Sequence, residues 1–288
     1  MSEIKVSGLS HVYSADTPFE KIAIDNVNVE IPHGQLVGLI GHTGSGKSTF
    51  IQHLNGLLVP SSGTVLVDSV NINGDKAAAR DVRFKVGLVF QYPEYQLFEE
   101  TVYADIAFGP KNMKLTESEI DERVREAAAL VGVGEELFER SPLELSGGQK
   151  RRVAIAGVIA MRPGVLILDE PTAGLDPAGC QRILKTICDY REKTGSTVVI
   201  VSHRMDDVAR IADRLIVFNH GSIRFDGTPE EVFSNPKELS DIGLSVPAPT
   251  QIASALREQG VEIEGSVYTT EQLLAALLKL KKEVGRNA

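Results

Sequence analysis

The stretch from residue 41 to residue 49 has the residue types and the spacing needed to bind phosphate. It fits the pattern G-x-x-x-x-G-K-[ST] and consists of Gly41, His42, Thr43, Gly44, Ser45, Gly46, Lys47, Ser48 and Thr49. The glycines let the backbone curl so that its N–H groups point inward, and the start of a following helix favours anions. In such a loop Lys47 supplies a charge for the β- and γ-phosphates, and Ser48 supplies a hydroxyl for Mg²⁺. The sequence therefore predicts a nucleotide phosphate site here.

A second candidate anion site lies much further along the chain, in a Leu-Ser-Gly-Gly-Gln run. Its members are Leu145, Ser146, Gly147, Gly148 and Gln149. Ser146 can cap the helix predicted directly after it, and the two glycines leave bare N–H groups at the start of that helix. The run has no lysine equivalent to Lys47. We therefore expect it to close on a nucleotide that is held by a second subunit.

Four polar residues stand at the ends of predicted buried strands. They are Gln91 after a strand at 85–90, Asp169 and Glu170 after a strand beginning at 165, and His203 after a strand at 197–201. Ligands of open α/β sheets lie beyond the carboxyl ends of the strands, so these side chains should meet beside the phosphate loop. Asp169 and Gln91 are candidates for Mg²⁺, and Glu170 can polarise a water for attack on the γ-phosphate. His203 can hydrogen-bond that phosphate and the water.

Two further residues are candidates for the nucleotide site. Tyr13 ends the first predicted strand, where its ring could stack on an adenine base or simply pack against the sheet. Asp176 precedes Pro177 and suits the N-cap of the following helix, with a second role at a subunit contact.

The elements that must position these residues alternate between strands and helices. Apolar runs and alternating patterns predict a strand pair at 63–73 and single strands at 4–13, 22–31, 36–40, 85–90, 165–168, 197–201, 213–219 and 222–225. Helical spacing and capping signals predict helices at 48–58, 117–131, 150–161, 177–193, 250–259 and 270–284, with a short one from Thr228. The segment from about 91 to 162 is a helical insertion. The fold class is therefore α/β, with a phosphate-loop core, an antiparallel β subdomain, the insertion and a small helical C-terminal extension.

Composition narrows the function further. The 288 residues carry a net charge of -9, which argues against a dedicated nucleic-acid binder. Cys180 and Cys188 lie in one predicted helix and suit a reducing cytosol. No apolar stretch approaches the roughly 20 residues of a membrane span. We expect a nucleotide-binding domain at 1–235 and an extension at 236–288.

The last predicted helix carries a leucine stripe, formed by Leu273, Leu274, Leu277 and Leu278. We expect this stripe to pack within the extension, in preference to forming a dimer seam.

With these residues assembled, the chain resembles the ATP-binding-cassette ATPases from about residue 4 to residue 235. The phosphate loop, Gln91, the Leu-Ser-Gly-Gly-Gln run, Asp169 with Glu170, Asp176 and His203 occur in the order of that family. The resemblance implies a head-to-tail dimer with two ATP molecules, each held between Lys47 of one subunit and Ser146 of the other. It implies Glu170 as general base, His203 as its γ-phosphate partner and Tyr13 as the adenine-stacking residue.

A narrower resemblance is to the ATPases of energy-coupling-factor transporters, which import vitamins or transition-metal ions in prokaryotes. It rests on the run from Gln91 to Phe98, on Thr101-Val102, and on the Ala-Phe-Gly-Pro run that ends at Pro110. The run from Pro171 to Pro177 looks like the second ATPase of such pairs. This implies a second, non-identical ATPase, a transmembrane coupling protein and a substrate-binding membrane protein, with the chain peripheral at the cytoplasmic face of the cell membrane. The aromatic stretch from Tyr92 to Phe98 would form the groove for a cytoplasmic helix of the membrane protein.

Three other functions compete with this one. The chain could serve another ATP-binding-cassette importer. A soluble cassette ATPase acting on DNA or the ribosome would usually carry a long coiled coil, a second cassette or a basic arm, and none is found in the sequence. A nucleotide-binding regulator without turnover would need Glu170 or His203 to be missing, and both are present.

Overall fold

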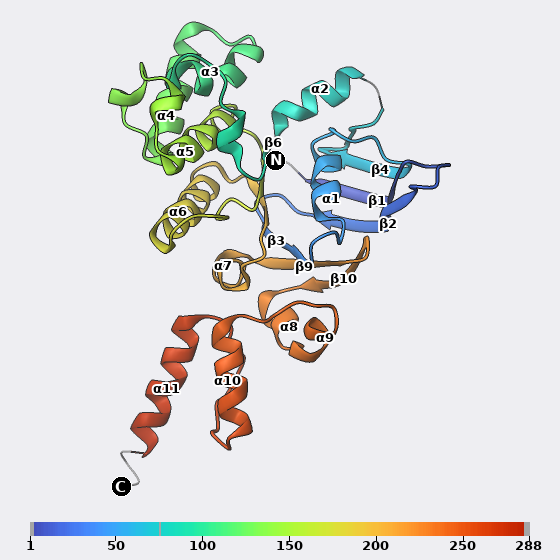
Figure 1. Ribbon diagram of the computed structural model, residues 1–288, viewed down its shortest axis with the longest axis vertical. Coiled ribbons are helices and arrows are strands. Elements are labelled where there is room, and N and C mark those ends of the chain that lie inside the picture. The colour runs from blue at the N-terminus through green and yellow to red at the C-terminus, as the bar shows by residue number, and fades with distance from the viewer. Residues whose placement is uncertain (1–2, 75, 285–288) are drawn as a thin grey trace.

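The computed structural model describes residues 3–74 and 76–284 (Figure 1). In that part of the chain the central sheet has the strand order β10-β9-β3-β8-β7-β6, and all neighbours are parallel except β9 and β10. Its strands are β3 (Leu36–Gly41), β6 (Val86–Val89), β7 (Val165–Asp169), β8 (Thr197–Val201), β9 (Arg214–Asn219) and β10 (Ser222–Gly227). The strands β3, β6, β7 and β8 are buried along their whole length, as continuous apolar runs in a parallel sheet should be.

A second, antiparallel sheet pairs strands in the order β2-β1-β4-β5. Its strands are β1 (Ile4–Tyr13), β2 (Lys21–Ile31), β4 (Ser62–Val67) and β5 (Val70–Asn71). Strands β1 and β2 pair antiparallel, as the predicted antiparallel β subdomain requires. Two helices accompany this half of the molecule, α1 (Lys47–Leu54) and α2 (Lys76–Lys85). Figure 1 shows them with the antiparallel sheet on one side of the central strands, opposite the helices of the insertion.

Alternate residues of the central strands belong to two different apolar clusters. In β3, Leu36 and Ile40 pack with the insertion helices, whereas Val37 and Leu39 pack with α1 and the antiparallel sheet. Successive side chains of a strand point to opposite faces, so the central sheet separates two cores.

The insertion is helical, as predicted. It contains η1 (Pro93–Gln96), α3 (Val102–Asn112), α4 (Glu117–Val131), η2 (Glu135–Leu137), η3 (Pro142–Glu144) and α5 (Gly147–Ile159). The bounds of α4 match the prediction because both ends carry strong signals. Thr116 and Glu119 form a capping box at its start, and Gly132 ends it in the left-handed region with φ 69°.

The helix after the phosphate loop is shorter than predicted. It ends at Leu54 instead of residue 58, because Gly56 takes a left-handed conformation with φ 69° just beyond it. A Cβ at Gly56 would also lie 2.6 Å from Ile72, so the turn leaves no room for a side chain. Helices α2 and α7 (Met205–Ile211) were not predicted.

The remaining helices are α6 (Pro177–Thr194), α8 (Pro229–Phe233), α9 (Pro236–Asp241), α10 (Ala248–Glu258) and α11 (Thr270–Val284). Figure 1 shows α10 and α11 side by side at the C-terminal end of the molecule. They share a small apolar cluster that includes Ala253 and Leu273. Leu239, Leu244 and Val246 instead belong to the larger core. The division at residue 235 stays a prediction.

The expected packing of the leucine stripe is wrong for three of its four members. Leu274, Leu277 and Leu278 are 57%, 38% and 50% exposed, and Leu273 alone among the four is buried. The side of α11 that packs within the extension consists of Leu273, Ala276 and Leu280, which follow one another at helical spacings of three and four. The densest run of leucines is therefore rotated away from that contact.

Candidate functional site

The phosphate loop holds its lysine through its own carbonyl groups. The Lys47 ammonium donates hydrogen bonds to Gly41 O at 2.7 Å and to His42 O at 3.0 Å. Burial lowers the pKa of Lys47, and the charges of Glu170 and Asp169 oppose that shift. Gly46 precedes α1 with φ 109°, and a Cβ there would lie 2.5 Å from Ala23 O. The loop therefore packs closely against β2 and keeps a buried cation at its centre.

The structure brings Gln91, Glu170 and His203 together at the carboxyl ends of the central strands. Gln91 Nε2 donates to Glu170 Oε2 at 3.0 Å, and His203 Nε2 lies 2.6 Å from Glu170 Oε1. Both oxygens of one carboxylate are thus held by side chains that follow two other strands. The predicted meeting of these residues is confirmed.

Glu170 reaches this position through an uncommon backbone conformation. Its φ is 49°, in the left-handed region, which costs a residue other than glycine about 1 kcal/mol. Two backbone hydrogen bonds hold it there: its N–H donates to Val201 O at 3.0 Å, and its carbonyl accepts from Ala173 N at 3.1 Å. Strand β7 therefore ends at Asp169, and the chain turns at Glu170, so that Glu170 no longer follows the direction of the strand.

Asp169 and Ser48 form the part of the site that suits a hard cation. Asp169 is buried; burial raises the pKa of its carboxyl group most, Glu170 raises it further, and Lys47 and a hydrogen bond from Ser48 lower it. A carboxylate, a hydroxyl and the amide oxygen of Gln91 are the oxygen ligands that Mg²⁺ prefers. The residues present therefore fit Mg²⁺. In the described ranges, no group of three His, Cys, Asp or Glu side chains could hold a metal by itself.

A cavity of about 420 Å³ unites most of the predicted nucleotide residues. Its lining includes Tyr13, Thr43, Gly44, Gly46, Lys47, Ser48, Thr49, Gln91, Glu170 and His203. The Tyr13 hydroxyl lies 3.2 Å from Thr49 Oγ1, which ties the first strand to the phosphate-loop helix. Gly41, His42, Ser45 and Asp169, which were also predicted for this site, do not line the cavity.

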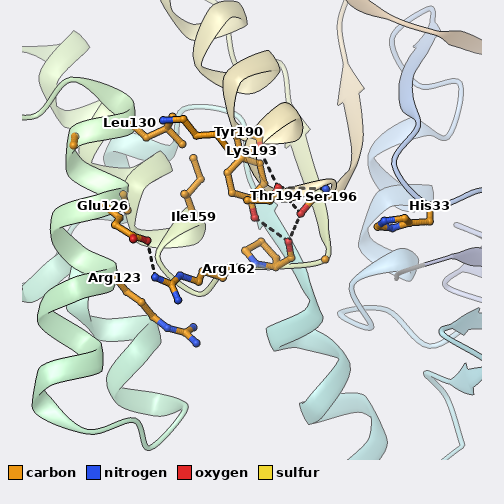
Figure 2. Close-up of a pocket in the computed structure, with 14 residues that line it drawn as sticks. His33, Arg123, Glu126, Leu130, Ile159, Arg162, Tyr190, Lys193, Thr194 and Ser196 are labelled. Carbon is orange, nitrogen blue, oxygen red and sulfur yellow. Dashed lines mark hydrogen bonds and ion pairs between the residues drawn. The ribbon is translucent and has the colours of Figure 1, made fainter.

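A larger cavity, of about 960 Å³, lies at the opposite edge of the central sheet. Figure 2 shows Arg162, Tyr190, Ser196 and His33 around it, and these residues lie near the starts of the central strands. Volume alone would favour this cavity. The candidate catalytic residues Glu170 and His203 instead line the smaller cavity of about 420 Å³, beside the carboxyl ends of the central strands.

The Leu-Ser-Gly-Gly-Gln run caps helix α5, as predicted. Ser146 Oγ accepts from Gln149 N at 3.4 Å, and Gln149 Oε1 accepts from Ser146 N at 2.9 Å, so the two residues form a capping box. None of Ser146, Gly147, Gly148 and Gln149 lines the cavity beside Lys47. A single chain does not bring the two predicted anion sites together.

Asp176 takes the predicted N-cap position of helix α6. Its Oδ1 accepts a hydrogen bond from Gly179 N at 2.6 Å. Asp176 also shares a smaller cavity, of about 200 Å³, with Gly148 and Arg182. The start of α6 and the start of α5 are therefore neighbours in space.

Sequence reasoning missed an ion pair between Arg151 and Glu94. The Arg151 side chain is 3% exposed and the Glu94 side chain is 17% exposed. Arg151 donates to both Glu94 oxygens, at 2.9 and 3.1 Å, and also to the carbonyls of Pro171 and Ala173. One side chain of α5 thus joins the aromatic stretch at residues 92–98 to the turn that follows Glu170. The only sign of this ion pair in the sequence is that Glu94 is an acidic residue within an aromatic stretch.

Replacing Glu94 with Ala is expected to destabilise the protein by about 3 kcal/mol, because it leaves the Arg151 charge buried without its counterion. Chemical denaturation of the purified chain measures this change. The matched control is Asp189→Ala, which removes an exposed ion pair with Lys185 and should cost less than about 1 kcal/mol. Equal losses in the two variants would contradict the role of burial.

Comparisons with known proteins agree with this geometry. The ABC transporter family model matches residues 24–173, more than half of the chain. An energy-coupling factor transporter ATP-binding protein EcfA2 from Clostridium perfringens is 56% identical over 278 residues, covering 96% of this chain and 98% of that protein. A protein of the same name from Caldanaerobacter subterraneus is 54% identical over 276 residues, covering 96% of each chain.

Solved structures give the same family. The structure of cbiO1 from Clostridium perfringens, described as part of the ABC transporter complex cbiONQ, superposes with a TM-score of 0.74. It is 39% identical and covers 88% of this chain and 98% of that one. The ATP-binding cassette MJ0796, solved as a dimer bound to ADP and Pi, has a TM-score of 0.71 at 28% identity and covers 78% of this chain and 98% of that one. This chain is therefore an ATPase that belongs to the ATP-binding-cassette family and, within it, to the energy-coupling-factor transporter ATP-binding proteins.

Proposed function

We propose that this chain hydrolyses ATP in a composite site, together with a second cassette, to drive uptake through a membrane complex. The observation that carries the proposal is the Glu170 carboxylate, which Gln91 and His203 hold beside the phosphate loop. Because ATP hydrolysis needs a positioned water more than covalent chemistry, a carboxylate fixed at both oxygens is well suited to the task.

Each residue of the site has a role in this mechanism. Lys47 and the N–H groups of the phosphate loop bind the β- and γ-phosphates, and Tyr13, which lines the same cavity, would stack on the adenine. Ser48, Asp169 and Gln91 would hold Mg²⁺, which neutralises charge on the phosphate oxygens. Glu170 accepts the proton of the attacking water as general base. His203 donates a hydrogen bond that orients Glu170, and it also lines the cavity in which the γ-phosphate would bind.

The second half of the site comes from a partner cassette. The first turn of α5 is open: a Cβ on Gly147 would meet no other atom within 4 Å. The start of α5 is capped by Ser146 and Gln149 but is not covered by other parts of the chain that the structure describes. It therefore suits a phosphate bound by another subunit. The relative MJ0796 is described as dimeric. We propose a non-identical partner, because the run from Pro171 to Pro177 resembles the second ATPase of such pairs.

The membrane partner would bind at the aromatic stretch. Tyr95 and Phe98 are 86% and 65% exposed. Beside them lies a cavity of about 320 Å³, whose lining includes Leu97, Phe98, Phe108 and Met161. Exposed aromatic side chains around an apolar cavity are typical of a protein contact, and a cytoplasmic helix of the transmembrane protein fits it. The ion pair of Glu94 with Arg151 would relay this contact to the turn beside Glu170.

The proposed location of the chain in the cell follows from its proposed contact with a membrane protein. The structure describes no helix long and apolar enough to cross a bilayer. We propose that the chain is peripheral at the cytoplasmic face of the cell membrane, and that a separate membrane protein selects the solute, a vitamin or a transition-metal ion. Purification of the native complex with identification of its subunits tests this. Copurification with ribosomes or nucleic acid and no membrane protein would overturn it.

Replacing Phe98 with Asp is expected to lower solute uptake at least tenfold, because it places a charge in the apolar contact with the membrane protein. The ATP affinity of the isolated chain should not change. Copurification of the membrane subunits and uptake into cells measure the effect. The control is Phe19→Asp, a change at a phenylalanine that is 83% exposed and lies in the loop between β1 and β2. Full uptake and assembly in the Phe98 variant would contradict the proposed groove.

A further inference from the structure

We infer that Asp207 is a positioning residue that holds His203 against Glu170. Asp207 lies on α7, four residues after His203, and is 5% exposed. The inference rests on the proposed pairing of Glu170 and His203 in hydrolysis. It concerns a carboxylate that does not line the phosphate-loop cavity.

The contacts of Asp207 close a ring around the catalytic pair. Asp207 Oδ2 accepts a hydrogen bond from Thr172 Oγ1 at 3.2 Å, and Thr172 stands two residues after Glu170. The same oxygen lies 2.9 Å from Nε of Arg204, the residue directly after His203. The ring therefore runs from Glu170 to Thr172 along the chain, across to Asp207 and Arg204, back to His203, and across the 2.6 Å contact to Glu170.

The ring matters because both members of the catalytic pair lie on turns. Glu170 has a left-handed backbone, and His203 lies two residues beyond the end of β8 with its side chain 41% exposed. Apart from Glu170, no hydrogen-bond partner of the His203 side chain is found in the described residues. Asp207 fixes the two turns relative to each other through Thr172, which is buried, and through Arg204. A fixed separation keeps the general base oriented when the site closes on its substrate.

The structure supplies a matched control next to Asp207. Asp206 is on the same helix but exposed, and its Oδ1 accepts a hydrogen bond from Ala248 N, at the start of α10, at 3.0 Å. In the described part of the chain, the Asp206 side chain forms no hydrogen bond or ion pair with Thr172 or Arg204. Asp206→Asn therefore changes the same charge on the same helix without touching the ring.

Steady-state ATP hydrolysis by the assembled complex tests the inference. Thr172→Val and Asp207→Asn should each lower kcat about tenfold and change KM for ATP less than twofold, because the base is misoriented and the phosphate loop is intact. Thr172→Ser keeps the hydroxyl and should restore kcat, and Asp206→Asn should match the unaltered complex. Normal kcat in both the Thr172→Val and the Asp207→Asn complexes would overturn the inference. So would an equal loss in Thr172→Ser and Thr172→Val.

A double variant separates this inference from the proposed function. In a Glu170→Gln background, Asp207→Asn should cause no further loss, because the pair that it positions no longer works. A further tenfold loss in that background would mean that Asp207 acts elsewhere, and the inference would fail. Normal turnover of Glu170→Gln alone would instead overturn the assignment of the general base.

Discussion

Replacing Glu170 with Gln is expected to lower ATP turnover of the assembled complex by at least about 100-fold and to leave ATP binding unchanged. General bases contribute about 10²- to 10⁴-fold to catalysis, and glutamine cannot accept the proton of water. Glutamine has nearly the same shape as glutamate and leaves Lys47 and the phosphate loop unchanged. Only its carbonyl oxygen accepts a hydrogen bond, so it can keep one of the two contacts that Gln91 and His203 make with Glu170. The variant should therefore bind ATP and accumulate as the ATP-closed dimer.

Two measurements check this result. Phosphate release gives the turnover, and size-exclusion chromatography with ATP and Mg²⁺ gives the fraction of closed dimer. Glu192→Gln, an exposed change on α6, serves as the control and should behave like the unaltered protein. Turnover within about threefold of the control would refute Glu170 as general base.

The sequence predicted those parts of the site that depend on local pattern and on one topological rule. The Gly-rich loop, the helix cap of Ser146 and the N-cap of Asp176 are local, and all three are present. The meeting of Gln91, Glu170 and His203 needed only the expectation that carboxyl ends of parallel strands share an edge. The left-handed backbone of Glu170 follows from contacts with β8 and left no pattern in the sequence.

The contacts that join distant segments could not be predicted in this way. Arg151 and Glu94 are 57 residues apart, and Thr172 and Asp207 are 35 residues apart. Their pairing depends on how the insertion and α7 pack against the core, which no periodicity records. Helix α7 was itself missed, because it has only seven residues. The same limit explains the leucine stripe, since spacing alone does not say which side of α11 meets α10.

Within one chain, the two predicted anion sites are therefore separated in space. The phosphate loop and the catalytic pair are complete within one chain, but the first turn of α5 lies outside their cavity. In the proposed mechanism, hydrolysis is conditional on a second cassette, because the donors at the start of α5 would come from that partner. This separation also allows an experiment in which the phosphate-loop cavity and the start of α5 are altered by separate substitutions.

Replacing Gly147 with Asp is expected to abolish ATP turnover of the complex while the chain itself stays folded and binds ATP. Nothing lies within 4 Å of a Cβ at this position, so the chain has room for the new side chain. Gly147 is the first residue of α5, where a carboxylate is favoured by the helix dipole by about 0.5 kcal/mol. Thermal stability should thus be equal or slightly higher. The same carboxylate would face the triphosphate held by the partner cassette and repel it.

The comparison with Gly147→Asn isolates the charge, because asparagine has nearly the same shape and also suits the start of a helix. We expect the Asn complex to retain more turnover than the Asp complex, with equal binding of a fluorescent ATP analogue to both isolated chains. Loss of ATP binding by the isolated Asp chain would mean that α5 contacts its own nucleotide. Full turnover of the Asp complex would mean that no phosphate ever approaches this helix, and either result would refute a site shared between two cassettes.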